Sequence, residues 1–191
     1  PFLSYQVDEA SAISNAGRFM TEGNADAVKL EVDGNWVDRF AAICNAGIAA
    51  VAHLGSKPQQ AKQTGGYTTA GRSAVAAKII VEDAVAMEQA GASMLLLEAV
   101  PEEVSIAVVE ATHVPVIGCG AGTACHGQVV VMQDLAGMTA WQPSFAKPTA
   151  RIGEEITAVA STWMQNVSTN NLGKHPYNMH DGESELFKER G

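Results

Sequence analysis

The stretch SAVAAKIIVEDAVAMEQAGASMLLLEAVP, residues 73–101, contains the pattern that repeats along this chain and decides its fold. Its first part, 73–91, has apolar residues at helical spacing and ends on a glycine, a common residue just past a helix. Residues 94–98 then form a short apolar run that is typical of a buried strand. The run ends on Glu98, a charged residue that is costly to bury unless it is paired or used. Taken alone, Glu98 is most simply a surface residue at the end of a strand.

The same alternation of short apolar runs and longer helical stretches predicts parallel β–α units in an α/β fold. We expect strands near 27–31, 48–53, 94–98 and 114–118, with a weaker one at 144–147. We expect helices near 7–23, 35–47, 73–91, 102–112 and 152–167, and a short helix within 127–137. Five strands suit an open doubly wound sheet, whereas a closed (β/α)8 barrel needs eight.

Composition limits the class of protein. The 191 residues suit a single domain over 1–191, with a polar C-terminal tail at 173–191. The net charge of −9 argues against a nucleic-acid or anionic-membrane partner. The apolar runs are too short to span a bilayer, and no signal-peptide pattern opens the chain. Three cysteines without a C-x-x-C pair argue against a structural zinc site and indicate reduced thiols in a cytoplasmic protein.

Polar residues stand at the ends of three successive predicted strands. Lys29 and Glu31 are two residues apart, so they share one face of the first strand. His53 ends the second strand and Glu98 ends the third. Each has an ordinary structural explanation when taken alone. Because α/β folds build their sites at the carboxyl ends of strands, the four residues together favour a functional site.

The glycine-rich stretch VIGCGAGTACHG, residues 116–127, superficially suggests a dinucleotide-binding loop. The G-x-G-x-x-G pattern would need a glycine where Thr123 stands, and no acidic residue closes a second strand about twenty residues further on. We therefore reject a nicotinamide cofactor. Such a loop can approach a ligand closely or simply turn tightly.

Five blocks of sequence point to a known family. They are DAVKLE, GIAAVAHLGSKPQQAKQTGGYTTAGR, EDAVAMEQAGASMLLLEAVP, VPVIGCGAGTACHGQVVVMQDLAGM and PSFAK, in order over about residues 1–150. The most specific is H-x-G-x-x-P-Q followed by G-G-Y-x-x-x-G-R. In these blocks the chain resembles the ketopantoate (3-methyl-2-oxobutanoate) hydroxymethyltransferases, in the phosphoenolpyruvate mutase/isocitrate lyase superfamily of barrels.

The resemblance implies a fold, a reaction and a role for each strand-end residue. The fold would be a (β/α)8 TIM-type barrel, of which this chain covers about strands 4–8. The reaction would transfer a hydroxymethyl group from 5,10-methylenetetrahydrofolate to 3-methyl-2-oxobutanoate, with Mg2+ stabilising an enolate. Glu31 would ligate Mg2+, Lys29 and His53 would contact the 2-oxo acid, and Glu98 would handle the proton on C3. The resemblance also implies a homo-oligomer.

The sequence also departs from the family's pattern. Three further strands and two metal-ligating aspartates of the family fall before the first residue, so we expect either a fragment or a shortened homologue. Local departures are Val32 and Asp33 in place of two glycines, Ala52 in VAH, Lys57 for threonine, His126 for aspartate and Gln133 for histidine. Asp33 would either replace some missing negative charge or, as we favour, be a solvated loop residue. The alternatives to the transferase are a diverged 2-oxo-acid lyase or mutase and a truncated, catalytically silent structural homologue.

Overall fold

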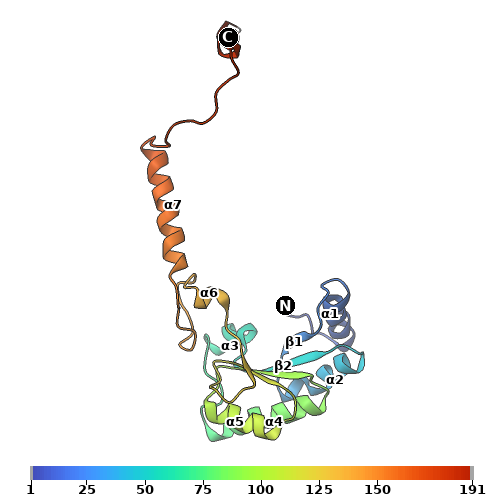
Figure 1. Ribbon diagram of the computed structural model, residues 1–191. Coiled ribbons are helices and arrows are strands. Elements are labelled where there is room, and N and C mark those ends of the chain that lie inside the picture. The colour runs from blue at the N-terminus through green and yellow to red at the C-terminus, as the bar shows by residue number, and fades with distance from the viewer. Residues whose placement is uncertain (1, 190–191) are drawn as a thin grey trace. The chain divides into compact units, whose positions relative to one another are not determined.

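The computed structural model describes residues 2–189 and shows an α/β protein built on a parallel sheet (Figure 1). The chain forms two compact units. The first contains Pro1–Val131 and Pro143–Ala146, and the second contains Met132–Gln142 and Lys147–Gly191. The single domain over 1–191 stays a prediction.

The first unit contains a five-stranded sheet whose strands are adjacent in the order of the sequence. The strands are β1 (Val28–Glu31), β2 (Ala50–Gly55), β3 (Met94–Glu98), β4 (Val116–Cys119) and β5 (Gly127–Gln128). Every neighbouring pair is parallel. The predicted parallel α/β fold and its first four strands are therefore confirmed.

One helix precedes the first strand and the others connect the strands, and local sequence explains several of their ends. They are α1 (Glu9–Thr21), η1 (Gly34–Trp36), α2 (Val37–Asn45), η2 (Pro58–Gln60), α3 (Ala61–Thr64), α4 (Ala74–Gln89) and α5 (Glu102–Ala111). Asp8 caps α1 by accepting a hydrogen bond from the amide of Ser11, and Ser73 caps α4 by accepting one from Ala76. Gly91 follows α4 with φ +100°, a backbone region that favours glycine.

The core lies between the sheet and the helices on one of its faces (Figure 1). Helix α4 packs against β2 and β3, and α5 packs against α4. Leu95 and Leu97 of β3 are fully buried, as are Ala84 and Met87 of α4. Because successive strand residues alternate between faces, the intervening residues of β3, including Glu98, lie on the opposite face.

The prediction of a strand at 144–147 is wrong. The amide of Ala146 donates to the carbonyl oxygen of Pro143, which closes a turn there. Prolines stand at both flanks of the segment, and proline cannot donate to a strand ladder. The fifth strand is β5 instead, and it takes the start of the segment in which we expected a helix.

The second unit contains α6 (Met132–Leu135), α7 (Ile152–Ser168) and α8 (Glu183–Glu189). Helix α7 confirms the helix expected near 152–167. It presents exposed apolar side chains at Ile152, Ile156, Val159, Trp163, Met164 and Val167. Residues 173–189 of the polar tail are exposed throughout.

Among residues 2–189, no helix combines the length and the apolar character that crossing a bilayer requires.

Candidate functional site

The sheet brings the four predicted site residues onto one face. Glu31 is paired in register with His53, and Glu98 is paired with Gly55, two residues after His53. Residues that are paired in register, or two apart on a strand, share a face. Lys29, two residues before Glu31, therefore lies on the same face as the other three. This face is opposite to the one that α4 covers.

His53 is the centre of the group, because its imidazole is buried between two charged side chains. The residue is 1% exposed, and its Nδ1 lies 3.1 Å from Nζ of Lys29. An ammonium group can only donate, so Nδ1 accepts and the proton of a neutral imidazole is on Nε2. That Nε2 lies 3.1 Å from Oε2 of Glu98.

The contact between Nε2 of His53 and Glu98 is close but not directed as a hydrogen bond. Within the described part of the chain, Nε2 has no hydrogen-bond partner of normal geometry, although the atom is buried. The 3.1 Å separation still brings donor and carboxylate together, so we treat it as an electrostatic contact. A buried donor without a directed partner is costly, and the carboxylate of Glu98 is the acceptor that lies beside it.

Glu98 has a side chain that is 18% exposed, which leaves its carboxylate accessible beside His53. The chain after β2 lies close to the backbone of Glu98. The amide of Ser56 donates to the carbonyl oxygen of Glu98 at 2.8 Å. Gly55 has φ +91°, and a Cβ there would lie 2.4 Å from the same carbonyl oxygen. Only glycine permits this approach, which holds the end of β3 against the end of β2.

Glu31 is buried at the end of β1, and two residues that sequence reasoning missed hold it. The amide of Gln59 donates to Oε2 of Glu31 at 2.9 Å, and the hydroxyl of Tyr5 donates to its backbone carbonyl at 2.7 Å. Burial, with the charges of Glu31 and Asp33, raises the pKa of Tyr5 to about 12 and keeps the phenol a neutral donor. Gln59 closes the H-x-G-x-x-P-Q motif, which was a usable signal. No sequence pattern pointed to Tyr5.

The described residues offer one suitable ligand for a magnesium ion rather than a complete site. Mg2+ takes six oxygen ligands, of which proteins commonly supply one or two carboxylates. Glu31 is a buried carboxylate of the right chemistry. Across residues 2–189, however, no three His, Cys, Asp or Glu side chains form a group that could hold a metal. Glu31 fits one position of the shell, and its role as a ligand stays a prediction.

Asp33 is not the solvated loop residue that we favoured. Its side chain is 25% exposed and forms an ion pair with Lys57. Burial alone would raise the pKa of the Asp33 carboxyl, but hydrogen bonds from Lys57 and Asn35 and the charge of Lys57 outweigh it and lower that pKa. Much of the negative charge of Asp33 is thereby matched by Lys57.

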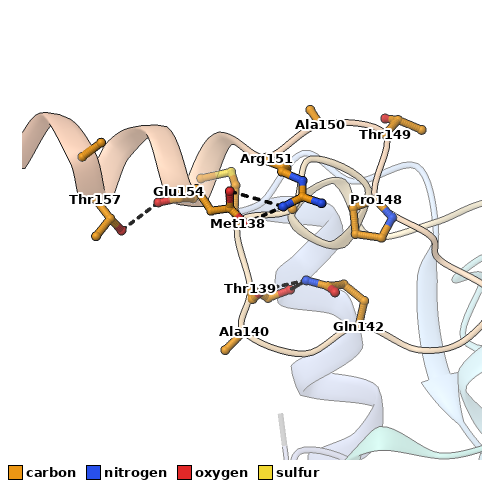
Figure 2. Close-up of a pocket in the computed structure, with 13 residues that line it drawn as sticks. Met138, Thr139, Ala140, Gln142, Pro148, Thr149, Ala150, Arg151, Glu154 and Thr157 are labelled. Atoms are coloured by element: carbon orange, nitrogen blue, oxygen red, sulfur yellow. Dashed lines mark hydrogen bonds and ion pairs between the residues drawn. The ribbon is translucent and has the colours of Figure 1, made fainter.

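The second unit holds an open pocket of about 950 Å³ (Figure 2). Its polar side chains pair with one another. Arg151 contacts Glu154 at 3.1 Å, and the amide of Gln142 donates to the hydroxyl of Thr139 at 3.1 Å. None of the four predicted site residues lines this pocket. It offers no acid–base pair comparable to the contact between imidazole and carboxylate on the sheet.

The fold and the site define a class. An ammonium, an imidazole and two carboxylates gathered on one face of adjacent parallel strands are typical of α/β proteins that bind small molecules near the carboxyl ends of their strands.

Comparison with known proteins names the family within that class. Residues 1–175 match the family model described as Ketopantoate hydroxymethyltransferase, and the chain belongs to this family. It is 39% identical over 189 residues to a 3-methyl-2-oxobutanoate hydroxymethyltransferase of Clostridium beijerinckii, covering 98% of this chain and 69% of that protein. It is 42% identical over 181 residues to one of Moorella thermoacetica, covering 94% and 66%. The chain thus spans about two thirds of the length of these relatives.

Proposed function

We propose that the protein transfers a hydroxymethyl group from 5,10-methylenetetrahydrofolate to 3-methyl-2-oxobutanoate and forms 2-dehydropantoate. Membership of the family supports this reaction. The observation that carries it is the array Lys29–His53–Glu98, in which a buried imidazole has an ammonium on one ring nitrogen and an accessible carboxylate at the other. The array combines the cation Lys29, which would attract an anionic substrate, with the carboxylate of Glu98, which would accept a proton from that substrate.

The chemistry begins with removal of the proton from C3 of the 2-oxo acid. In this proposal the carboxylate of Glu98 accepts that proton, and the electron pair of the C–H bond passes into an enolate. His53 is buried with Nε2 3.1 Å from Oε2 of Glu98, so in this proposal the imidazole holds that carboxylate in place for the proton transfer. Lys29 supplies positive charge on the same face, which favours the anionic substrate and its enolate.

Water supplies the hydroxyl oxygen: it adds to the methylene carbon of the folate, both bonds from that carbon to folate nitrogens break, and each nitrogen takes a proton. The enolate carbon then forms a bond to the formaldehyde carbon so released, and the resulting alkoxide takes the proton held by Glu98 to give the hydroxymethyl group and free tetrahydrofolate. Mg2+, when bound, would stabilise negative charge on the 2-oxo acid, with Glu31 as one of its ligands. We further propose that the sheet corresponds to strands 4–8 of a (β/α)8 barrel. The family's homo-oligomeric assembly also remains part of the proposal.

The proposal is tested by following the C3 proton in D2O. The protein, as its gene encodes it, is incubated with Mg2+ and 3-methyl-2-oxobutanoate, and proton NMR follows the C3 methine signal. We expect the methine signal to disappear and the methyl doublet to collapse to a singlet. On addition of methylenetetrahydrofolate we expect the new CH2 signals of 2-dehydropantoate. Exchange without transfer would favour a diverged 2-oxo-acid enzyme, and absence of both would favour a silent homologue.

A further inference from the structure

Asp33 and Lys57 form an ion pair that joins the segment after β1 to the segment after β2. Their side chains are 25% and 16% exposed. The surface pair of Lys78 and Glu82 is much more open, with side chains that are 78% and 62% exposed. Because water screens exposed charges strongly, the shielded pair couples its two segments more tightly than the surface pair does.

A second connection, two residues away on each side, joins the last residue of β1 to the same segment after β2. Gln59 follows Lys57 by two residues, and its amide donates to the carboxylate of Glu31, which precedes Asp33 by two. Pro58 lies between Lys57 and Gln59 and is the first residue of η2. The ring fixes the φ angle of Pro58 and so restricts the backbone between Lys57 and Gln59. A shift of Lys57 would therefore also shift the amide of Gln59.

Helix α4 holds the residue that follows Asp33. Asp83 of α4 accepts a hydrogen bond from the amide of Gly34 at 2.9 Å. A Cβ at Gly34 would lie 2.9 Å from the same carboxylate oxygen, so a side chain there would push the Asp83 carboxylate away from this amide. Asp33, Lys57 and Asp83 line one cavity of about 600 Å³. The pair is therefore anchored to a packed helix rather than to a loose loop.

We propose that Asp33 and Lys57 are a positioning pair that holds the amide of Gln59 against Glu31 and so fixes the direction of the Glu31 carboxylate. The consequence for metal binding rests on the proposed function, in which Glu31 is a ligand. The structural part does not depend on that function.

The first experiment measures hydrogen exchange of the Gln59 amide. Asp33→Asn, Lys57→Met and the double variant form a cycle, and Lys78→Met is the control that breaks an exposed pair. We expect each single variant to speed exchange at Gln59 by about tenfold, with Ala52 in the middle of β2 unchanged. If the pair acts as a unit, the double variant is no faster than either single one.

Three results would overturn the proposal. Unchanged exchange at Gln59 in the single variants would show that the pair does not hold this amide. An equal rise at Ala52 would show general destabilisation instead of positioning, and additive effects in the double variant would show that the two residues act separately. This experiment requires no activity, so it remains decisive if the protein does not process a 2-oxo acid.

The second experiment measures how the rate of C3 proton exchange depends on Mg2+ concentration. We expect Lys57→Met to raise the Mg2+ concentration for half-maximal rate about five- to tenfold, with the rate at saturating Mg2+ within about twofold of wild type. Lys78→Met should match wild type in both. A fall in the saturating rate at an unchanged Mg2+ requirement would overturn the link to Glu31. If the wild type itself shows no exchange, the proposed function fails while the Gln59 measurement stands.

Discussion

Replacing Glu98 with glutamine tests whether this residue is the proton acceptor. Glutamine keeps the size and planarity of the side chain but removes its charge and its basicity. Because the side chain is 18% exposed and Oε2 lies 3.1 Å from Nε2 of His53, the amide can occupy the same place beside the imidazole. The substitution should therefore leave the sheet and the opposite, buried face of β3 intact.

The expected loss of rate in Glu98→Gln follows from the role of Glu98 as a base. A positioned base contributes about a hundred- to ten-thousand-fold to a proton transfer. At about 1.4 kcal/mol per tenfold, this corresponds to about 3–6 kcal/mol of activation free energy. Binding of Mg2+ and of the 2-oxo acid should change little, since Glu31, Lys29 and His53 remain in place.

The assay is C3 proton exchange in D2O, which isolates deprotonation from hydroxymethyl transfer because it needs no folate. Glu103→Gln is the matched control, since Glu103 is an exposed carboxylate near the start of α5. We expect the control to exchange at the wild-type rate and Glu98→Gln to lose at least about a hundredfold. Wild-type exchange in Glu98→Gln would refute its role as the base. Loss of Mg2+ binding in a calorimetric titration would make it a metal ligand instead.

Four further predictions address the metal, the pH dependence and the packing. Glu31→Gln should weaken Mg2+ binding markedly, measured by isothermal titration, and equal affinities would place the metal elsewhere. The pKa of Tyr5 is about 12 in the folded protein and 10.0 ordinarily, so the unfolded state loses the phenol proton first as pH rises. The free energy of unfolding should therefore fall by up to about 2 kcal/mol between pH 10 and 12. Urea unfolding should show this fall in the wild type and not in Tyr5→Phe. Gly55→Ala should lower the melting temperature more than Gly65→Ala, because both have positive φ but only a Cβ at 55 meets backbone. Leu97→Ala should cost about 2–5 kcal/mol in unfolding free energy, and a loss below about 1 kcal/mol would contradict its full burial.

The pattern of apolar residues was sufficient to predict most of the fold. The run Met94–Leu97 ends on a charged residue and follows a helix that stops at Gly91, and each of these signals is local. Local signals failed where the chain turns between prolines. At 144–147 the apolar character suggested a strand, but a strand also needs a neighbour with free hydrogen-bonding groups, and β5 pairs with β4 instead.

The candidate site was partly predictable for the same reason. Lys29, Glu31, His53 and Glu98 stand at predicted strand ends, and parallel strands in sequence order bring such ends together. The roles proposed for them came from the family motifs, because a strand-end carboxylate looks the same in sequence whether it binds metal, moves a proton or is merely solvated.

The sequence by itself determined the parallel α/β class, the first four strands, the helices between them and the family to which the chain belongs. Only the tertiary structure decided which side chains touch. It set His53 between Lys29 and Glu98, and it joined Asp33 to Lys57 across 24 positions of sequence. Contacts of this kind depend on the register between strands and on how closely glycine lets two segments approach. Register and approach result from the packing of the whole sheet, so no local pattern encodes them.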